Sequence, residues 1–321
     1  MSDRNDETFA AEYDALAAGC GYHSLANWSV VTLTGADRQS FLHNICTNDV
    51  RKLAVGEGCE AFCTDVKGKI VAHLFAFLLA DHIVLLTVAD QAERIVSHLD
   101  RYIIREDVQL ADATLTQVWT VLAGDRVETV LPVQLERPWQ ITSCEFGAVE
   151  CLLARFPLPG RKAYLLGASR EHVAELQRIL HAAGGCACGD EAWTCLRVES
   201  GLPLFGVDFD STNLPQEVSR NAQAISFTKG CYLGQETIAR LDALGHVNKQ
   251  LATLKFAESA QPTPGTPLTH DGQPAGTATT IAWSPRLGAP LALGMVRRGS
   301  NAIGTMLDSP CGPVEVVATA C

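Results

Sequence analysis

The residues best suited to chemistry lie in the octapeptide KGCYLGQE at positions 229–236. Glycines stand at 230 and 234, and glycine is favoured where the backbone takes a positive φ or where another group approaches closely. Because a helix-like run follows at once, Cys231 should lie in a tight loop ahead of a helix N-terminus. Free amides and the helix dipole there, with Lys229 two residues away, would lower the pKa of the thiol and favour thiolate.

A second interpretation of Cys231 stays open, because cysteine is often a small buried side chain without chemical function. The chain has twelve cysteines in 321 residues and no signal-peptide pattern, which favours reduced thiols over disulfides. The pairs Cys59/Cys63 and Cys186/Cys188 have no further ligands at the spacing of a zinc site. We therefore expect no bound metal.

Composition limits the partners. The net charge is −11, from 25 basic and 36 acidic residues, which disfavours bulk binding to nucleic acid or to an anionic membrane. The most apolar stretch, residues 70–89, is interrupted by His73, Asp81 and His82. It predicts a β-hairpin, since a membrane span needs about 20 uninterrupted apolar residues. We expect a cytoplasmic protein that does not enter a membrane.

The elements that position the octapeptide follow from hydrophobic periodicity, with period two for strands and about 3.6 for helices. Asp37 is the predicted N-cap of one helix, and Asp90 with Glu93 is the predicted capping box of another. Ser169 is the predicted cap of a third helix. Helices are predicted at 6–18 and after Asp37, Asp90, Ser169 and Asp190, and strands at 28–34, 61–65, 68–79, 83–88, 149–156, 163–166, 251–256, 277–283, 292–296 and 314–317.

The order of these elements predicts an α+β fold. Similar strand–helix pieces begin at residues 85–86 and 165–166, 80 residues apart, which indicates two related units. Hairpins crossed by helices predict units of split β-α-β, or ferredoxin-like, type. Short β runs after a turn-rich stretch predict a small β-barrel. We expect a core over residues 1–250, made of units at 1–115 and 116–250, and a barrel over 251–321.

The octapeptide, with Ala239-Arg240 after it, resembles the signature of the YgfZ-type folate-binding proteins. These are implicated in tRNA modification and iron–sulfur cluster maintenance, and they are relatives of the T protein (aminomethyltransferase) of the glycine cleavage system. The resemblance runs from about Trp28 to the C-terminal barrel and includes TGAD at 34–37 and LPQE at 214–217. It implies a three-domain cloverleaf whose two α+β units interleave around a central channel that holds tetrahydrofolate. The implied signature loop consists of Lys229, Gly230, Cys231, Tyr232, Gly234, Gln235 and Glu236.

The resemblance also implies folate contacts. Glu199 stands where the T protein has its pterin-binding acid, and a buried carboxylate can accept both the N3–H and the 2-amino group of a pterin. Trp28 and Trp193 match two tryptophans assigned to folate, although a tryptophan judged without the family is more often a core residue. The anionic glutamate tail of folate needs a cation. The candidates for that cation are Arg197, Lys229 and Arg240.

One position departs from the T protein. That enzyme uses an aspartate in a glycine-rich strand entry, and Ala72 and His73 stand in the matching place here. Alanine cannot accept a proton, whereas histidine titrates near neutrality. In an alternating strand, however, we expect His73 to be a satisfied core residue or a surface residue. Losing the acid argues against aminomethyl transfer and leaves folate binding open.

Three functions follow from these patterns. The first is a tetrahydrofolate-binding accessory protein that supports iron–sulfur enzymes and tRNA methylthiolation, acting on tRNA only indirectly, with Cys231 as a conditional thiol. The second is an aminomethyltransferase that works with a lipoyl carrier protein. The third is a thiol redox enzyme in which Cys195 or Cys63 resolves Cys231, although the chain has no Cys-x-x-Cys pair.

Overall fold

The computed structural model describes residues 3–319, and side chains from 7 to 318. The chain folds into two compact units, each built from several separate stretches of sequence. The first unit comprises Met1–Thr64, Val71–Trp193 and Gln223–Leu233, and the second comprises Asp65–Ile70, Thr194–Ala222 and Gly234–Cys321.

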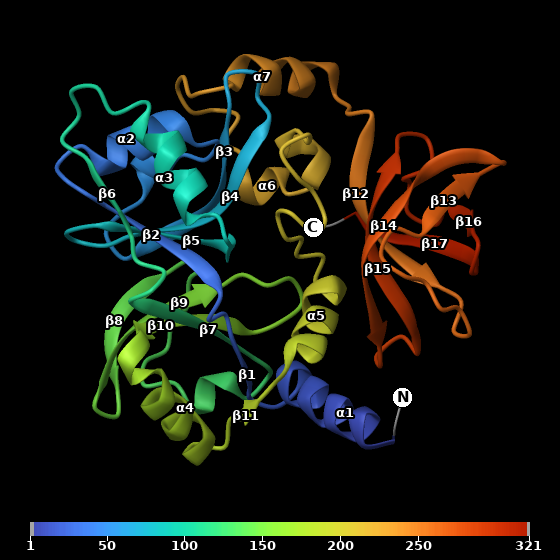
Figure 1. Cartoon of the computed structure of the whole chain (residues 1–321), viewed down its shortest axis with the longest axis horizontal. Coiled ribbons are helices and arrows are strands. Elements are labelled where there is room, and N and C mark those ends of the chain that lie inside the picture. The colour runs from blue at the N-terminus through green and yellow to red at the C-terminus, as the bar shows by residue number, and fades with distance from the viewer. Residues whose placement is uncertain (1–2, 320–321) are drawn as a thin grey trace. The chain divides into compact units, whose positions relative to one another are not determined.

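One sheet of the first unit has five strands in the order β3-β4-β5-β2-β6. On β4, Ala72, Leu74 and Ala76 alternate toward a core that also receives Phe41 from helix α2 and Leu99 from helix α3. Alternate side chains of one strand point to opposite faces, so this face is apolar and helix-covered (Figure 1). The bounds are β2 Trp28–Thr34, α2 Arg38–Ile45, β3 Glu57–Thr64, β4 Ile70–Leu78, β5 Ile83–Ala89, α3 Ala92–Asp100 and β6 Gln109–Asp112.

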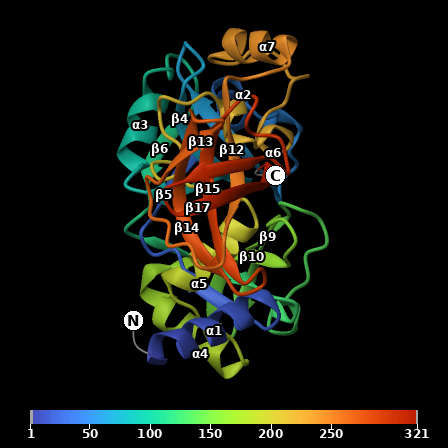
Figure 2. The ribbon, with the colours of Figure 1, turned by 90° about the vertical axis from the view of Figure 1, so that its right-hand side faces the viewer.

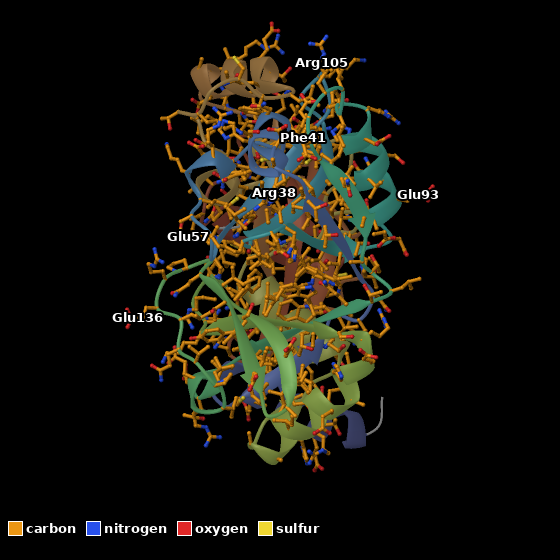
Figure 3. All side chains as sticks on the ribbon, turned by 90° about the vertical axis from the view of Figure 1, so that its left-hand side faces the viewer. Arg38, Phe41, Glu57, Glu93, Arg105 and Glu136 are labelled. Carbon is orange, nitrogen blue, oxygen red and sulfur yellow. The ribbon has the colours of Figure 1, made fainter. Side chains whose placement is uncertain are left out.

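In the five-stranded sheet and its helices, apolar side chains face the core and charged side chains face solvent. Figure 3 labels several of these residues. Phe41 is buried, whereas Glu93 and Arg105 are exposed. Arg38 of α2 donates to the carbonyl oxygens of Gly35 at 2.9 Å and Ala80 at 2.6 Å, so it ties the helix to the β4–β5 turn.

The other sheet of the first unit has six strands in the order β11-β1-β7-β10-β9-β8. Helix α4 covers one face with Leu176 and Leu180, which pack against Leu153, Tyr164 and Leu166 of the strands. Strand β1 precedes the five-stranded sheet in sequence, so the two sheets are interleaved along the chain. The bounds are α1 Asp3–Ala17, β1 Gly21–Ser24, β7 Gln117–Ala123, β8 Ile141–Phe146, β9 Val149–Phe156, β10 Ala163–Ser169, α4 Val173–Ala182 and β11 Cys186–Ala187.

An aromatic layer joins the two sheets of the first unit. Phe77 stacks on Trp119 with ring centroids 5.7 Å apart, and Phe75 meets the edge of Phe156 at 5.3 Å. Trp139 contacts Phe75 at 5.6 Å and Phe156 at 5.7 Å. Aromatic pairs at these distances stabilise a structure beyond the burial of their apolar area. These pairs therefore hold the two sheets of the first unit against each other.

The second unit contains a closed six-stranded barrel in the order β12-β15-β14-β13-β16-β17, seen face-on in Figure 2. Leu254, Phe256, Val296 and Val314 fill its interior. A Cβ at Gly294 would lie 2.7 Å from the Leu254 side chain, so close strand packing requires glycine there. The bounds are β12 Lys249–Phe256, β13 Pro267–His270, β14 Gln273–Ser284, β15 Ala289–Arg297, β16 Met306–Ser309 and β17 Gly312–Thr319.

Irregular segments and helices complete the second unit. Helix α5 (Asp190–Glu199) starts in the first unit and ends in the second, and α7 spans Gln235–Leu244. Residues 194–222 join the barrel, because Ser219 donates to Leu251 O at 2.9 Å and Arg197 donates to Thr280 at 2.9 Å. This differs from the predicted partition, which placed the segment in the second α+β unit. The remaining short elements are η1 Val50–Lys52, η2 Val127–Thr129, η3 Arg170–His172, η4 Pro215–Val218 and α6 Asn221–Ala224.

The α+β class, the interleaving and the closed barrel are confirmed. None of the three predicted caps makes its side-chain cap bond, although Asp37 does stand at the N-cap position of α2; Ser169 precedes η3, and α4 begins after His172. Asp37 makes no cap bond and instead accepts from Asp107 N at 2.9 Å, while α3 begins after Gln91, whose amide donates to Ser29 Oγ. Local sequence could not show these choices, because both partners come from distant segments. Among the helices of residues 3–319, none combines the length and apolarity needed to cross a membrane.

Candidate functional site

Lys229 anchors the loop that carries Cys231. Its ammonium donates to three backbone carbonyl oxygens, His43 at 2.5 Å, Cys46 at 2.7 Å and Asn48 at 2.8 Å. These carbonyls belong to the end of α2 and the turn after it, where helical carbonyls lack intrahelical partners. Lys229 is only 7% exposed, and burial lowers the pKa of its ammonium, although nearby Cys46 and Asp49 oppose that shift.

Further bonds fix the loop to the first unit. Tyr232 is buried, and the Lys229 ammonium lies 4.8 Å from the centre of its ring. Leu233 N donates to Asn44 O at 3.0 Å, and Thr64 Oγ1 donates to Leu233 O at 2.6 Å. Between these anchors, Cys231 is an exposed free thiol. The lysine and tyrosine of the signature therefore hold the loop, and the cysteine faces solvent.

Two expectations about this loop need correction. The Lys229 ammonium is directed at three carbonyls, so it is committed to them and not to the thiol. Of the two glycines, Gly234 takes a left-handed backbone with φ of 80° ahead of α7. Gly230 has no positive φ, and a Cβ at this position would meet no heavy atom within 4 Å. Helix α7 begins at Gln235, and Glu236 is exposed in its first turn.

The two predicted stacking residues lie in different settings within the first unit. Trp28 is half-buried at the start of β2 and stacks on Phe75 with ring centroids 6.1 Å apart and an interplanar angle of 12°. Trp193 is only 5% exposed and stacks on His23 at 5.9 Å. His23 is itself held, since its Nδ1 lies 2.9 Å from Cys188 O. Trp28 thus retains some open surface, and Trp193 is largely enclosed.

Glu199, in the second unit, is a buried and well-partnered acid. Its side chain is 2% exposed. Ser284 Oγ donates to Oε1 at 2.5 Å, and Arg286 Nε lies 3.6 Å from Oε2. Cys195 Sγ lies 4.0 Å from Oε1. Both oxygens are therefore oriented from the β14–β15 hairpin, a long-range arrangement that no local pattern could have revealed.

Arg197 forms a buried ion pair, which disfavours it as a contact for a folate tail. It is 3% exposed, and its guanidinium bonds Asp208 Oδ2 at 2.9 Å and Thr280 Oγ1 at 2.9 Å. Asp208 also accepts from Thr279 at 2.7 Å. Because this guanidinium is buried and both of its Nη atoms are bonded within the second unit, Arg197 is poorly placed to serve an anion at a solvent-facing opening. Arg240 on α7 is exposed and remains the candidate.

His73 is a satisfied core residue, as one of the two expectations held. Its Nε2 lies 2.8 Å from Oε1 of Glu60, and its ring stacks on Phe62 at 4.9 Å. Ala72 is fully buried on the opposite face of β4. Glu60 itself is 0% exposed and was missed, because a glutamate within a strand gives no sign of burial. A buried His–Glu pair thus lies at the strand position where the resemblance led us to look for a catalytic acid.

The thiols proposed to resolve Cys231 are poorly suited to exchange. Cys63 is 1% exposed, and burial raises the pKa of its thiol well above the usual value. Cys195, in the second unit, is also 1% exposed and donates to Trp283 O at 3.0 Å. Disulfide exchange needs an accessible thiolate, so these settings weigh against a dithiol mechanism.

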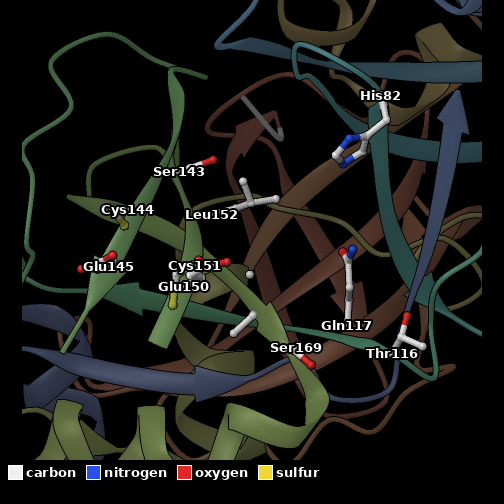
Figure 4. A pocket seen from close by; sticks show the side chains of 12 residues that line it. His82, Thr116, Gln117, Ser143, Cys144, Glu145, Glu150, Cys151, Leu152 and Ser169 are labelled. Atoms are coloured by element: carbon white, nitrogen blue, oxygen red, sulfur yellow. The ribbon is translucent and has the colours of Figure 1, made fainter. Parts of the chain in front are cut away.

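A cavity of about 710 Å³ in the first unit lies elsewhere. Figure 4 shows its lining, which includes His82, Gln117, Ser143 and the cross-strand pair Glu145 and Glu150. The predicted folate and thiol residues do not line it within the described part of the chain. Two opposed glutamates make this cavity unsuitable for the anionic tail of folate.

Comparisons with known proteins agree with this architecture. Residues 2–228 match the GCVT N-terminal domain, and residues 249–321 match the glycine cleavage T-protein C-terminal barrel domain. The structure resembles the glycine cleavage system aminomethyltransferase T from Bartonella henselae, with a TM-score of 0.85 and 17% identity, covering 97% of this chain and 88% of that one.

Curated relatives are also similar in sequence. The tRNA-modifying protein YgfZ of Yersinia pseudotuberculosis is 30% identical over 253 residues, 76% of this chain and 74% of that protein. A putative chloroplastic transferase of Arabidopsis thaliana is 25% identical over 310 residues, 94% of this chain and 70% of that protein. The fold, both domain matches and the YgfZ similarity together establish that the chain belongs to the glycine cleavage T-protein family and, within it, to the YgfZ group.

Proposed function

We propose that the protein binds tetrahydrofolate, or a one-carbon derivative, as an accessory protein that supports iron–sulfur enzymes and tRNA modification. The observation that carries this proposal is the environment of Glu199. A pterin presents adjacent N–H donors, and an ionised carboxylate with both oxygens oriented can accept two of them at once. Ser284 and Arg286 supply that orientation and a compensating charge.

Aminomethyl transfer is not part of the proposal. The position of the aspartate of the T protein is taken by Ala72, which lies in a core, and by His73, which is engaged with Glu60. A histidine whose Nε2 already has a buried carboxylate partner is poorly placed to orient an incoming nucleophile. Cys231, exposed on a rigidly held loop, is instead available as a conditional thiol toward a partner protein or a one-carbon unit.

Action on tRNA is proposed to be indirect. The relative named as tRNA-modifying supports a role in that process, and the net charge of −11 weighs against direct phosphate binding. The client would be an iron–sulfur enzyme of the cytoplasm. A gel-shift titration with bulk tRNA at low salt tests this point, and tight salt-dependent binding would contradict it.

Tetrahydrofolate titration by calorimetry tests the central claim. Glu199→Gln keeps the size of the side chain but removes the charge and one acceptor, so we expect affinity to fall at least about tenfold. Trp28→Ala should weaken binding through lost stacking. Glu145→Gln, an exposed glutamate on β8, is the matched control and should bind as wild type does. Equal affinity of the wild type, Glu199→Gln and Trp28→Ala would refute the proposed site.

A further inference from the structure

A cavity of about 320 Å³ lies within the second unit, and none of the proposed folate or thiol residues lines it. Helix α7 at its C-terminal end, the approach to β12, and the turn that follows β15 contribute to its wall, together with η4 and the start of α6. Its chemically active lining is Gln216, Asn221, Asp242, His246 and Arg298. The lining contains no phenylalanine, tyrosine or tryptophan side chain, so a flat heterocycle would find no stacking surface.

Two buried amide oxygens in this wall lack hydrogen-bond donors within the described residues. Gln216 is 5% exposed, and its Nε2 donates to Ile238 O at 2.7 Å, which fixes the orientation of the amide. Its Oε1 has no partner, and neither has Oδ1 of Asn221. A buried acceptor without a donor costs about 1–3 kcal/mol, so the wall favours a ligand that brings N–H donors.

Opposite charges stand at the same cavity. Asp242 and Arg298 are both exposed, and within the described chain neither has an ion-pair partner closer than 4.0 Å. His246 Nδ1 lies 2.8 Å from Leu244 O, so this nitrogen donates and Nε2 of the neutral ring is an acceptor. The cavity therefore offers acceptors for an ammonium and one guanidinium for a carboxylate.

We infer that this cavity binds a small zwitterionic amino acid. Its ammonium donates to the amide oxygens of Gln216 and Asn221, and its carboxylate pairs with Arg298. The volume suits such a molecule, and acceptors and a cation in one polar recess match both ends of it. This site is distinct from the proposed folate contacts, so its existence does not depend on them.

Calorimetric titration of the full chain with glycine, β-alanine and 4-aminobutyrate tests the inference, because these probes space the two charges differently. Acetate and methylamine each carry only one of the charges. We expect one zwitterion to bind, with both half-ligands at least about tenfold weaker, since a charge-assisted hydrogen bond is lost in each case. Arg298→Gln and Asn221→Ala should weaken the preferred zwitterion about tenfold or more.

Arg297→Gln is the matched control, because Arg297 is an exposed neighbour at the end of β15 that does not line the cavity. It should bind as wild type does, and circular dichroism confirms that each variant is folded. Absence of binding for all three zwitterions up to about 10 mM would overturn the inference. So would acetate or methylamine binding as tightly as a zwitterion, or unchanged affinity in folded Arg298→Gln and Asn221→Ala. Tetrahydrofolate affinity, measured in parallel, reports separately on the proposed function.

Discussion

Substituting Lys229 by methionine should destabilise the first unit without touching the exposed thiol. Methionine keeps most of the aliphatic stem but removes the ammonium that joins three carbonyls, at His43, Cys46 and Asn48. Each buried polar group left without a partner costs about 1–3 kcal/mol. The folded state of the variant no longer has to desolvate an ammonium, which offsets part of the cost of the three unpartnered carbonyls. We therefore expect the free energy of unfolding to fall by about 3 kcal/mol.

Urea unfolding measures this loss, with native-state hydrogen exchange over residues 223–233 as a local readout because two units can unfold separately. Cys231→Ala is the matched comparison two positions away. Cys231 is exposed and its truncation removes no buried contact, so the free energy of unfolding should change by no more than about 0.5 kcal/mol. Protection of the loop should fall only in Lys229→Met.

A free energy of unfolding of Lys229→Met within about 0.5 kcal/mol of wild type, or a larger loss in Cys231→Ala, would contradict a stabilising role for the three lysine hydrogen bonds. Either result would mean that the three carbonyls find other donors or that the loop is held chiefly by Tyr232 and Leu233. The structure instead predicts that Lys229 stabilises the loop, whereas Cys231 is an exposed thiol that contributes little to stability.

Three further predictions rest on single features. Asp208→Asn leaves the buried guanidinium of Arg197 without its counter-ion and should cost about 3–5 kcal/mol, seen as a lower urea midpoint; a change below about 1 kcal/mol would contradict the ion pair. Gly234→Ala should cost about 1–2 kcal/mol because φ is 80° there, while Gly230→Ala should be nearly neutral, and equal effects on thermal stability would disprove the assignment. Burial, with a hydrogen bond to Glu128, raises the pKa of Tyr164 from 10.0 to about 12, so the folded state holds this proton more tightly. Its contribution to stability is complete below pH 10 and is lost as pH rises toward 12, and unfolding of Tyr164→Phe should lack this component.

Much of the fold could be predicted because the signals are local. Strand β2 alternates apolar and polar residues, and the apolar run at 70–89 forms the expected β4–β5 hairpin. The short strands β1, β6, β11, β13 and β16 were missed, since two to four residues carry too little periodicity. Strands β7 and β8, of seven and six residues, were missed as well. The bonds from Arg197 and Ser219 that group residues 194–222 with the barrel could not be predicted, because their partners lie far along the chain.

The sequence could predict which residues belong to the candidate site, but not how buried each one is or which partners it bonds. The octapeptide signature alone pointed to Cys231 and to the family, because residue identity at consecutive positions is itself the signal. Only tertiary structure decided that Arg197 is a buried ion pair, that Glu199 is held from Ser284 and that His73 is paired with Glu60.

By itself, the sequence determined most of the elements, the α+β class and the signature loop, since these depend on neighbours within a turn or a strand. The roles of the charged residues were decided by tertiary structure. Lys229 reaches carbonyls more than 180 positions away, and Glu199 accepts from a serine 85 positions away. The role of a charged side chain depends on its burial and on its bonding partners. Those partners come from distant parts of the chain, so local sequence patterns cannot predict the contact.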